Sequence, residues 1–139
     1  MKRTANAVWN GSLKEGEGKL TTQSDVLKDT KYSFNTRFGE DKGTNPDELL
    51  AAAHAGCFAM ALSNILGTAG YTPDSLEVTS TITMDMKKLE LTGSHLKLKA
   101  KIPNIEQAKF EECAKDAKDN CPVSKALSLE ITMDAELEQ

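Results

Sequence analysis

The chain has 139 residues and a net charge of -4. An acidic chain lacks the basic surface that nucleic acids and anionic membranes attract, so we exclude both as partners. With 39% hydrophobic and 27% charged residues, the composition is that of a globular protein of one domain, residues 1–139. The N-terminal segment has no apolar run of the kind found in secretory signals. We therefore expect a cytoplasmic protein whose three cysteines remain reduced and available for chemistry.

The first part of the chain has patterns typical of β-strands. Alternation of apolar and polar residues predicts strands at residues 4–10, 19–24 and 32–38. In the third of these, Phe34 and Phe38 share one face and Arg37 lies on the other. A polar loop at 39–44 then leads into the most apolar segment of the chain.

That apolar segment, residues 45–66, begins like a helix. Asn45 can cap it, Pro46 suits its first position, and Glu48 can reach back to the cap. No charged residue occurs from Leu49 to Leu66. A helix that is apolar on every side must be covered on every side, so we expect a central buried helix. The polar chain around it favours this reading over a membrane span.

The rest of the chain completes an α+β pattern with mostly antiparallel strands. We predict a long hairpin of residues 76–86 and 91–102, an amphipathic helix at 106–119, a short helix after Cys121 and Pro122, and a closing strand at 129–137. On the amphipathic helix, Glu111 is expected to pair with Lys115 one turn later.

The three cysteines lie in different surroundings. Cys113 belongs to the apolar stripe of the amphipathic helix, where a cysteine is usually a small core residue. Cys121 precedes a proline that can start a helix, and the positive end of a helix favours the thiolate. The alternative is that Cys121 is only a fortuitous cap residue.

Cys57 lies inside the uncharged helix, directly after Gly56, a residue that would let a backbone or a ligand approach the thiol. Burial there should raise its pKa and leave an inert thiol. To react, Cys57 needs a cation that cannot lose its proton, which means arginine, and a buried arginine needs a carboxylate. A purely structural Cys57 remains the alternative.

His54 stands three residues before Cys57 on the same helix. A zinc site would need further ligands, and the sequence has neither a CxxC nor an HExxH pattern. Two residues on one helix usually point in parallel directions, so an activated Cys–His pair is also disfavoured.

Three segments, FNTRF (34–38), GTNPDELLAAAHAGCFAMAL (43–62) and NCPVSKAL (120–127), together resemble the OsmC/Ohr family of thiol-dependent peroxidases, with the OsmC branch nearest. The resemblance covers nearly the whole chain. It implies an OsmC-like fold, in which mostly antiparallel sheets surround a long buried central helix within an intertwined homodimer.

The resemblance also implies an activity, the reduction of organic hydroperoxides to alcohols without metal, haem or flavin. Cys57 matches the peroxidatic cysteine, which becomes a sulfenic acid, and Cys121 matches the resolving cysteine, which closes a disulfide with it. Arg37 matches the arginine that stabilises the thiolate. The implied reductant is an external dithiol, a dihydrolipoyl protein in the family.

One position departs from the family pattern. The carboxylate that holds the arginine is usually a glutamate directly after the proline, and here that residue is Asp47, with Glu48 next to it. The choice between the two is open. Asp47 lies about 15 Å from Cys57 along a straight helix. Either Arg37 spans this gap or a second copy brings its own helix start alongside, so we predict a homodimer with two sites at the interface.

The expected substrate pocket is apolar. Phe58 and Met60 flank Cys57 on the helix and Phe38 follows the arginine, so we assign all three to substrate binding. An apolar pocket favours bulky organic hydroperoxides over hydrogen peroxide. The alternative is that these side chains are simply core. Two other functions stay open: a binding protein for apolar small molecules, and a thiol–disulfide oxidoreductase.

Overall fold

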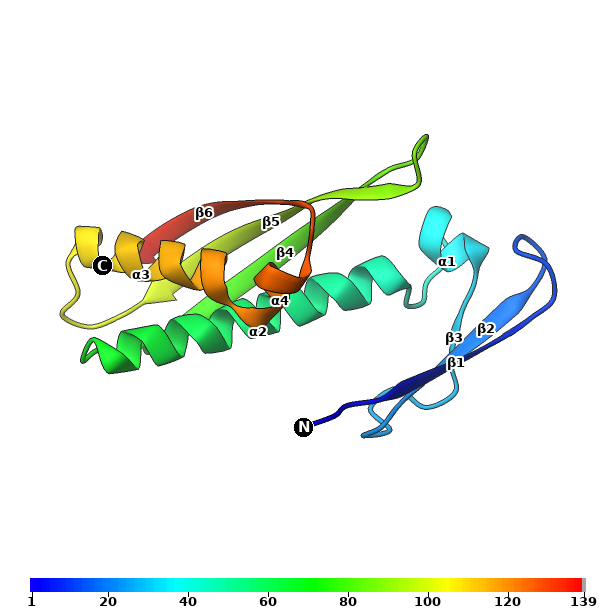
Figure 1. Ribbon diagram of the computed structural model, residues 1–139, viewed down its shortest axis with the longest axis horizontal. Helices are drawn as coiled ribbons and strands as arrows, with labels where there is room; N and C mark the ends of the chain where they lie inside the picture. Colours follow the sequence, from blue (N-terminus) through cyan, green and yellow to red (C-terminus); the bar gives the residue numbers. More distant parts are fainter. Residues whose placement is uncertain (139) are drawn as a thin grey trace. The chain divides into compact units, whose positions relative to one another are not determined.

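The computed structural model describes residues 1–138 and divides into an N-terminal unit, residues 1–49, and a C-terminal unit that begins at Leu50. The elements, in the order of the chain (Figure 1), are β1 (Ala5–Asn10), β2 (Glu17–Thr22), β3 (Thr30–Tyr32), α1 (Phe34–Phe38), α2 (Pro46–Thr68), β4 (Ser75–Asp85), β5 (Glu90–Lys101), α3 (Gln107–Asn120), α4 (Pro122–Ala126) and β6 (Glu130–Glu138). The α+β class predicted from the sequence is confirmed.

The N-terminal unit is a three-stranded antiparallel sheet in the order β1-β2-β3. Gly18 on β2 lies opposite Trp9 on β1 and Tyr32 on β3, and the two rings meet edge to face above it with centroids 5.5 Å apart. A Cβ at position 18 would lie 2.4 Å from the Tyr32 ring and 2.6 Å from Trp9, so only glycine fits. Among residues 1–49 only Gly18 and Thr44 are buried, so this sheet has no apolar core of its own.

The strand predicted at residues 32–38 is wrong, because β3 ends at Tyr32 and the next residues form helix α1. Ser33 caps α1. Its hydroxyl accepts the Thr36 amide at 3.3 Å, and the Thr36 hydroxyl accepts the Ser33 amide at 2.8 Å. This reciprocal capping box fixes a helix start. Phe34 and Phe38, one turn apart, then pack ring against ring at 5.0 Å.

Helix α2 begins with the predicted Asn45 cap and ends in a glycine turn. The Asn45 side chain accepts the Glu48 amide at 2.8 Å, which caps the first turn. At the other end Gly70 adopts a φ of +94°. The Tyr71 amide then bonds back to the Leu66 carbonyl at 2.8 Å and the Gly70 amide to that of Gly67 at 3.1 Å. Such a glycine-terminated pattern satisfies the last carbonyls of a helix.

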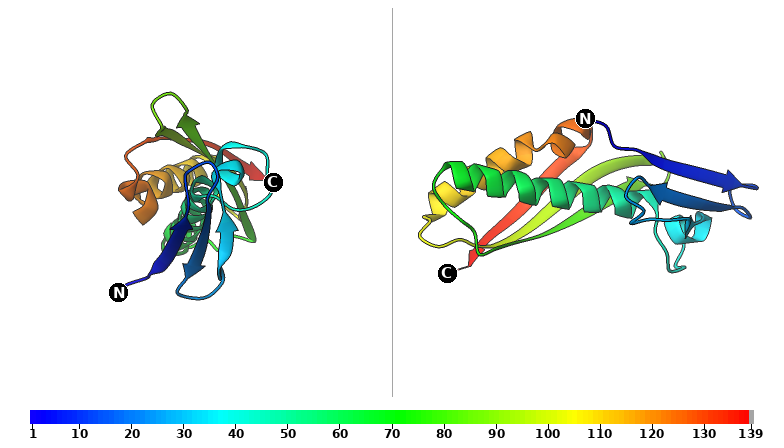
Figure 2. Two further views of the ribbon diagram at one scale, coloured as in Figure 1. Left: turned by 90° about the vertical axis from the view of Figure 1, so that its right-hand side faces the viewer. Right: turned by 90° about the horizontal axis from the view of Figure 1, so that it is seen from below.

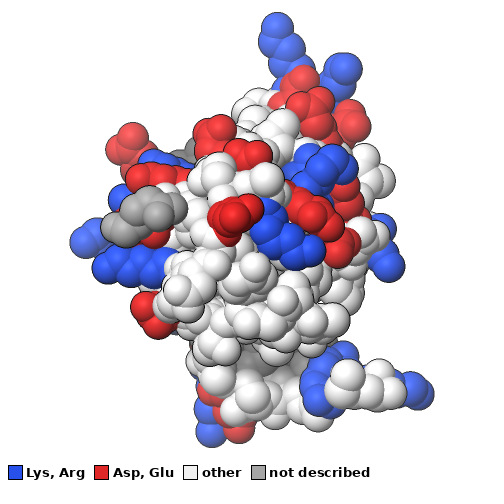
Figure 3. Space-filling view, turned by 90° about the vertical axis from the view of Figure 1, so that its left-hand side faces the viewer, with Lys and Arg blue, Asp and Glu red and all other residues white. Residues whose placement is uncertain are grey.

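The expectation that α2 is covered on every side does not hold for the single chain. Four of its residues are buried, all on one face: His54, Phe58, Leu62 and Leu66. Residues on the opposite face, such as Gly56 and Met60, are exposed. Figure 3 shows a broad area of uncharged atoms on one face of the molecule, with charged side chains around it. One face of a long uncharged helix is therefore left open.

By length and composition α2 could cross a membrane. Phe58, Leu62 and Leu66 instead belong to one core cluster with residues of the sheet and of α3. We therefore describe α2 as the core helix of a folded domain, as the sequence predicted.

The C-terminal unit contains a second three-stranded sheet in the order β4-β5-β6. Strands β4 and β5 form the long antiparallel hairpin that was predicted. Strand β6 instead runs parallel to β5, because the chain crosses the sheet through α3 and α4 before β6 begins. Three of the four strand pairings in the described chain are antiparallel.

The core of the C-terminal unit lies on one face of this sheet. Leu96, Leu98 and Ala100 of β5 point into it and are fully or almost fully buried, while Lys97 and Lys99 point to the other side. Helices α2 and α3 cover the apolar face (Figures 1 and 2). The buried residues of α3 are Phe110, Cys113, Ala114 and Ala117, so Cys113 belongs to the buried stripe as predicted.

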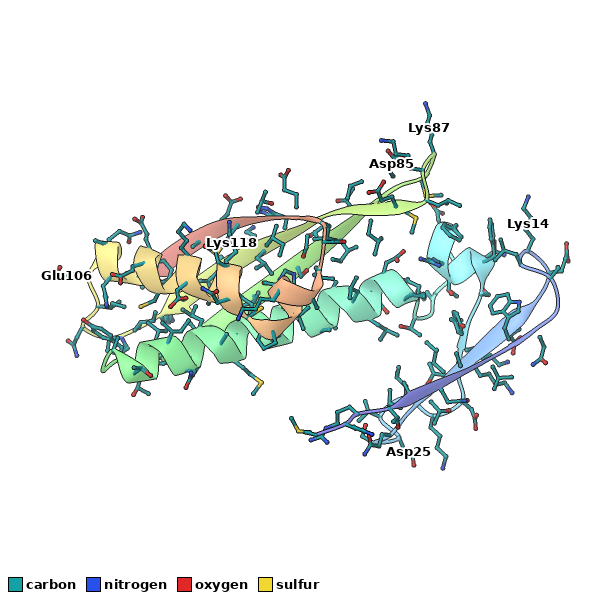
Figure 4. All side chains as sticks on the ribbon, viewed as in Figure 1. Lys14, Asp25, Asp85, Lys87, Glu106 and Lys118 are labelled. Atoms are coloured by element: carbon teal, nitrogen blue, oxygen red, sulfur yellow. The ribbon has the colours of Figure 1, made fainter. Side chains whose placement is uncertain are left out.

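The ion pair predicted between Glu111 and Lys115 is not formed. Lys115 instead bonds Asp119 at 2.6 Å, and Glu111 accepts from Gln107 at 3.0 Å. Each of these residues has a polar neighbour one turn away in both directions, and the spacing alone does not select between them. Elsewhere, charged side chains such as Glu106 before α3 and Lys87 at the hairpin tip project into solvent (Figure 4).

Candidate active site

Two of the three free cysteines lie next to each other in the C-terminal unit. Cys57 on α2 is partly buried, and Cys121 between α3 and α4 is 1% exposed. The Val123 amide points at the sulfur of Cys57 at 3.5 Å. Cys113, on the core side of α3, is also buried. The two cysteines singled out by the sequence are thus brought together by α2 and α4.

The first backbone amides of helix α4 donate hydrogen bonds to both sulfurs. Cys121 is its cap residue, and the Cys121 sulfur accepts the Ser124 amide at 3.4 Å. Pro122 follows at the first helical position, where its missing amide costs nothing. Val123 and Ser124 therefore direct their otherwise unpaired amides at Cys57 and Cys121 respectively. The short helix predicted after Cys121 is confirmed.

The Cys57 thiol is not activated by these neighbours. Burial raises its pKa above that of an ordinary thiol, and the adjacent Cys121 raises it further. The bond from the Val123 amide acts in the opposite direction but does not outweigh them. No arginine or lysine is among the described groups that shift this pKa. The sequence argument that Cys57 needs a cation therefore applies to the folded C-terminal unit as well.

Arg37, the cation suggested by the sequence, lies in the N-terminal unit on α1 and is held there by Asp47. Nε of Arg37 donates to Oδ2 of Asp47 at 3.4 Å, and Nη2 donates to Oδ1 at 3.2 Å. A paired contact of this kind fixes the plane of the guanidinium as well as its position. Among the described contacts of Arg37 none involves the Glu48 carboxylate, so the shorter aspartate is the partner.

The contact is possible with aspartate because α1 is tied to the start of α2. Nδ2 of Asn45 donates to the carbonyl of Thr36 at 3.0 Å, which holds the two helix ends together. Asp47 lies two residues after Asn45, within reach of Arg37. The Asp47 side chain, one methylene shorter than a glutamate, therefore still reaches Arg37.

Arg37 also borders a cavity of about 320 Å³ within the N-terminal unit. Its guanidinium lies 5.2 Å from the centre of the Phe38 ring. The remaining walls are mostly aromatic or apolar and are formed by Trp9, Leu13, Tyr32, Ser33 and Phe34. The cavity therefore presents one fixed positive charge in an apolar surrounding. Phe38 was singled out from the sequence, but the strand residues were missed because only the register of β1, β2 and β3 brings them together.

Phe58 and Met60 do not share a pocket in the single chain. Phe58 is 0% exposed and packs in the core, whereas Met60 is 76% exposed. Two residues apart on a helix, they are rotated by about 200° and face opposite ways. Phe58 is therefore core, which was the alternative reading, and the expectation that it contacts substrate is not supported. Met60 remains a predicted substrate contact.

His54 was not assigned a role from the sequence, yet it is the centre of a buried polar network. Its Nδ1 lies 2.6 Å from Oγ of Ser94 on β5, and its Nε2 lies 2.8 Å from Oγ of Ser124 on α4. The Ser124 hydroxyl in turn lies 3.0 Å from the Cys121 sulfur. Burial lowers the pKa of His54, which favours the neutral ring. In residues 1–138 no group of three metal-binding side chains comes together.

The sequence carried a signal for this network that went unused. Ser124 lies three residues after Cys121, at the spacing at which a helix cap residue bonds to the first turn. His54 is the one titratable residue between Leu49 and Leu66 besides Cys57. A buried histidine must find hydrogen-bond partners. Nothing in the sequence indicates that Ser94, forty positions away, is one of them.

Comparison with known proteins agrees with the fold. The OsmC-like protein family matches residues 39–136, which includes Asp47, Cys57 and Cys121 and begins just after Arg37. The chain belongs to the OsmC-like protein family. Within curated relatives, it is 44% identical over 137 residues to Peroxiredoxin OsmC of Escherichia coli K12, covering 97% of this chain and 96% of that protein. It is 31% identical over 124 residues to the organic hydroperoxide resistance protein OhrA of Bacillus subtilis, covering 85% and 86%.

Solved structures of the family share the fold. The organic hydroperoxide resistance protein OhrB of Bacillus subtilis superposes with a TM-score of 0.64 at 26% identity, over 97% of this chain and 98% of the other. An OsmC-like protein from Mycoplasma pneumoniae gives a TM-score of 0.78 at 17% identity, over 100% and 99%. The OsmC-like fold inferred from three short segments is therefore confirmed.

The buried His54 predicts a specific dependence of stability on pH. Its pKa in the folded state is below the unfolded value of 6.5. Above that pH the ring is neutral in both states and its contribution is complete. As the pH falls below 6.5 the unfolded chain takes up a proton that the folded state does not, so the free energy of unfolding should fall by up to about 1.4 kcal/mol per pH unit. We expect His54→Gln to remove this component in urea titrations between pH 7.5 and 5.

A core variant provides the control for this measurement. Leu98→Ala should lower the free energy of unfolding by about 2–5 kcal/mol while keeping the wild-type pH dependence. An unchanged pH dependence in His54→Gln would show that His54 does not stay neutral in the fold.

Proposed function

We propose that this protein is a cysteine-based peroxidase that reduces organic hydroperoxides to alcohols through Cys57 and Cys121. Similarity to Peroxiredoxin OsmC and to organic hydroperoxide resistance proteins supports a peroxidase-type function. The observation that carries the proposal is the pairing of a partly buried Cys57 with a buried Cys121 at the start of α4. Two thiols so placed can form an internal disulfide after one is oxidised.

In the first step the Cys57 thiolate attacks the outer oxygen of the hydroperoxide. The S–O bond forms as the O–O bond breaks, the alkoxide leaves with a proton as the alcohol, and Cys57 becomes a sulfenic acid. Arg37, held by Asp47, stabilises both the thiolate and the charge on the departing oxygen. Glu48 adds a negative charge to the first turn of α2, where Asn45 caps its amide, and it is not the partner of Arg37.

In the second step the Cys121 sulfur attacks the Cys57 sulfur and displaces the hydroxyl group, which leaves as water with the thiol proton. The product is a Cys57–Cys121 disulfide. An external dithiol then reduces it by two exchange steps and is itself oxidised to a disulfide. We propose a dihydrolipoyl protein as this reductant, with the cytoplasm as the compartment. No metal, haem or flavin takes part in these steps.

The cavity beside Arg37 supports a bulky, apolar hydroperoxide as substrate. Its aromatic walls suit an alkyl or aryl group, and Arg37 is the one charged residue that lines it. A hydroperoxide places its polar end at the guanidinium and its organic end against rings such as those of Phe38 and Trp9. Hydrogen peroxide has no group that could use these walls. The binding of apolar molecules without turnover, and the reduction of protein disulfides, are the alternatives that the experiment below separates.

Two features support a homodimer as the working form. One face of the uncharged helix α2 is open, and the N-terminal sheet has no core of its own. Both expose apolar surface that a second copy can bury. We propose that residues 1–139 fold as one domain in such a dimer, and that assembly completes each site by supplying Cys57 with an Arg37.

The first test is the mass of the intact reduced protein after one equivalent of cumene hydroperoxide. We expect a loss of two hydrogens, mapped to a Cys57–Cys121 disulfide, because these thiols are neighbours and Cys113 lies apart on α3. Cys121→Ser should stall at the sulfenic acid, Cys57→Ser should not react, and Cys113→Ser should behave like wild type. An unchanged mass would indicate that the protein binds apolar molecules without turning them over. A disulfide formed only by exchange with protein disulfides would point to an oxidoreductase.

The second test removes the proposed cation. Arg37→Met should raise the pKa of Cys57 and lower the second-order rate with cumene hydroperoxide at pH 7 by about 100-fold, the usual loss when a charge stabiliser is removed. The pH dependence of alkylation of Cys57 by iodoacetamide measures the pKa directly. Lys31→Met is the matched control, since Lys31 is exposed and pairs only with Glu17. Equal rates in the two variants would show that Arg37 takes no part in the reaction.

The third test concerns assembly. Sedimentation velocity at decreasing protein concentration should show a dimer, and a bulky Gly56→Leu variant should weaken it, since Gly56 lies on the open face of α2. In the single chain no atom outside the helix lies within 4 Å of a Cβ placed at Gly56 or at Gly67. Gly67→Leu, on the same face about three turns later, tests how far along the helix the interface extends. A folded monomer with full peroxidase activity would contradict the dimer.

A further inference from the structure

The peroxidase reaction proposed above makes no use of the most buried polar group in the molecule. His54 is 0% exposed and lies between two serine hydroxyls, those of Ser94 and Ser124. Beyond Ser94 the network continues to the Ser80 hydroxyl at 3.1 Å, and beyond Ser124 it reaches the Cys121 sulfur at 3.0 Å. One continuous series of hydrogen bonds thus joins the resolving thiol to an imidazole.

Either tautomer of the neutral ring satisfies these contacts, and one of the two directs protons toward His54. In that tautomer Nδ1–H donates to Ser94 and leaves Nε2 as an acceptor. The Ser124 hydroxyl donates to Nε2, and its oxygen accepts the thiol proton of Cys121. Both contacts, at 2.8 and 3.0 Å, are within hydrogen-bonding distance.

The surroundings keep Nε2 available as a base. The groups that face the ring are hydroxyls from β5 and α4, and the titratable groups near it are Cys121, reached through Ser124, and Cys57 on its own helix. Burial is the cause of its lowered pKa, and no charged side chain contributes to that shift. A neutral imidazole can accept a proton, whereas an imidazolium cannot.

Cys121 needs such a route because water does not reach it. The residue is 1% exposed, so its thiol proton cannot pass directly to solvent. The attack on the sulfenic acid of Cys57 requires the thiolate, and the departing hydroxide requires a proton. A group that accepts the proton of the Cys121 thiol and returns it to the departing hydroxide meets both needs.

We infer that Ser124 and His54 form a proton relay that serves Cys121 in the resolving step of the proposed peroxidase. The Cys121 proton moves to the Ser124 oxygen as the Ser124 proton moves to Nε2 of His54. The thiolate attacks the Cys57 sulfur, the S–O bond breaks, and the hydroxide takes the proton back through Ser124 and leaves as water. His54 acts through Ser124 and is a positioning residue for Cys121.

A structural role of His54 has to be distinguished from this relay, because the ring also ties α2 to β5 and α4. Loss of stability in a His54 variant would not separate the two. The rate of disulfide closure and the pH dependence of that rate separate the two roles, since only a role in proton transfer would change both.

The experiment follows the conversion of the Cys57 sulfenic acid to the disulfide in a single turnover, by dimedone trapping and mass spectrometry between pH 7 and 8.5. Ser124→Ala and His54→Gln should form the sulfenic acid at the wild-type rate. Their disulfide closure at pH 7 should be about 100-fold slower, the usual contribution of general-base assistance. Closure in these variants should accelerate with pH, because an unassisted thiol ionises only near pH 8.5 or so, while the wild-type rate stays nearly constant.

Two further variants serve as controls. Ser124→Thr keeps the hydroxyl and should restore closure to within about threefold of wild type. Ser80→Ala lies outside the relay, at the far end of the network, and should close the disulfide normally. Wild-type rates and pH dependence in both Ser124→Ala and His54→Gln would overturn the relay while leaving the peroxidase intact. No sulfenic acid in the wild type would overturn the peroxidase and, with it, the relay as its resolving step.

The same chemistry can be observed without peroxide. Reaction of Cys57 with 5,5′-dithiobis(2-nitrobenzoate) forms a mixed disulfide, and attack by Cys121 then releases a second nitrothiobenzoate anion. The second release should be slower in Ser124→Ala than in Ser80→Ala by the same factor as closure after peroxide. Equal second-phase rates would count against the relay independently of the peroxidase.

Discussion

The constraint on which the rest of this structure depends is the placement of a thiol, Cys57, inside a helix that carries no charge from Leu49 to its end. Burial raises the pKa of the Cys57 thiol, and the amide of Val123 does not offset it. A thiolate at this position therefore needs a cation from another part of the protein. The helix that buries the sulfur also presents an open apolar face. In the proposed homodimer, association would cover this face and supply the cation.

The chemistry is divided between the two units of the chain. The N-terminal unit holds a guanidinium in a defined plane through Asp47 and places it at the edge of an aromatic cavity. The C-terminal unit holds the two thiols and the polar network around His54. Neither unit has all the groups that the proposed reaction needs. Activity should therefore be sensitive to assembly as well as to the identity of any one side chain.

Much of this arrangement could be predicted from the sequence because local signals and pattern agreed. The cap at Asn45 and the uncharged run after it predicted the start and the length of α2, and Cys121-Pro122 predicted the start of α4. The strand predicted at 32–38 was wrong because an alternating aromatic pattern was given more weight than the Ser33–Thr36 capping box.

What could not be predicted depends on contacts between distant segments. The cavity walls combine residues of β1, β3 and α1, which only the register of the sheet brings together. The parallel pairing of β6 follows from the path of the chain over the sheet. The choice of Asp47 over Glu48 depends on how α1 meets the start of α2, which no local pattern records. Ser94 and Ser124 likewise meet His54 only in the folded chain.

The two sulfurs need different surroundings, because Cys57 is partly exposed and Cys121 is buried. In the proposed reaction Cys57 meets a substrate that arrives from outside, so a permanent charge can be brought to it on α1, which also borders the proposed substrate cavity. Cys121 is enclosed, and a buried cation there would cost several kcal/mol unless it were paired. Hydroxyls and a neutral imidazole avoid this cost because every group in the series can be satisfied without net charge. A charge then needs to exist beside Cys121 only while the disulfide forms.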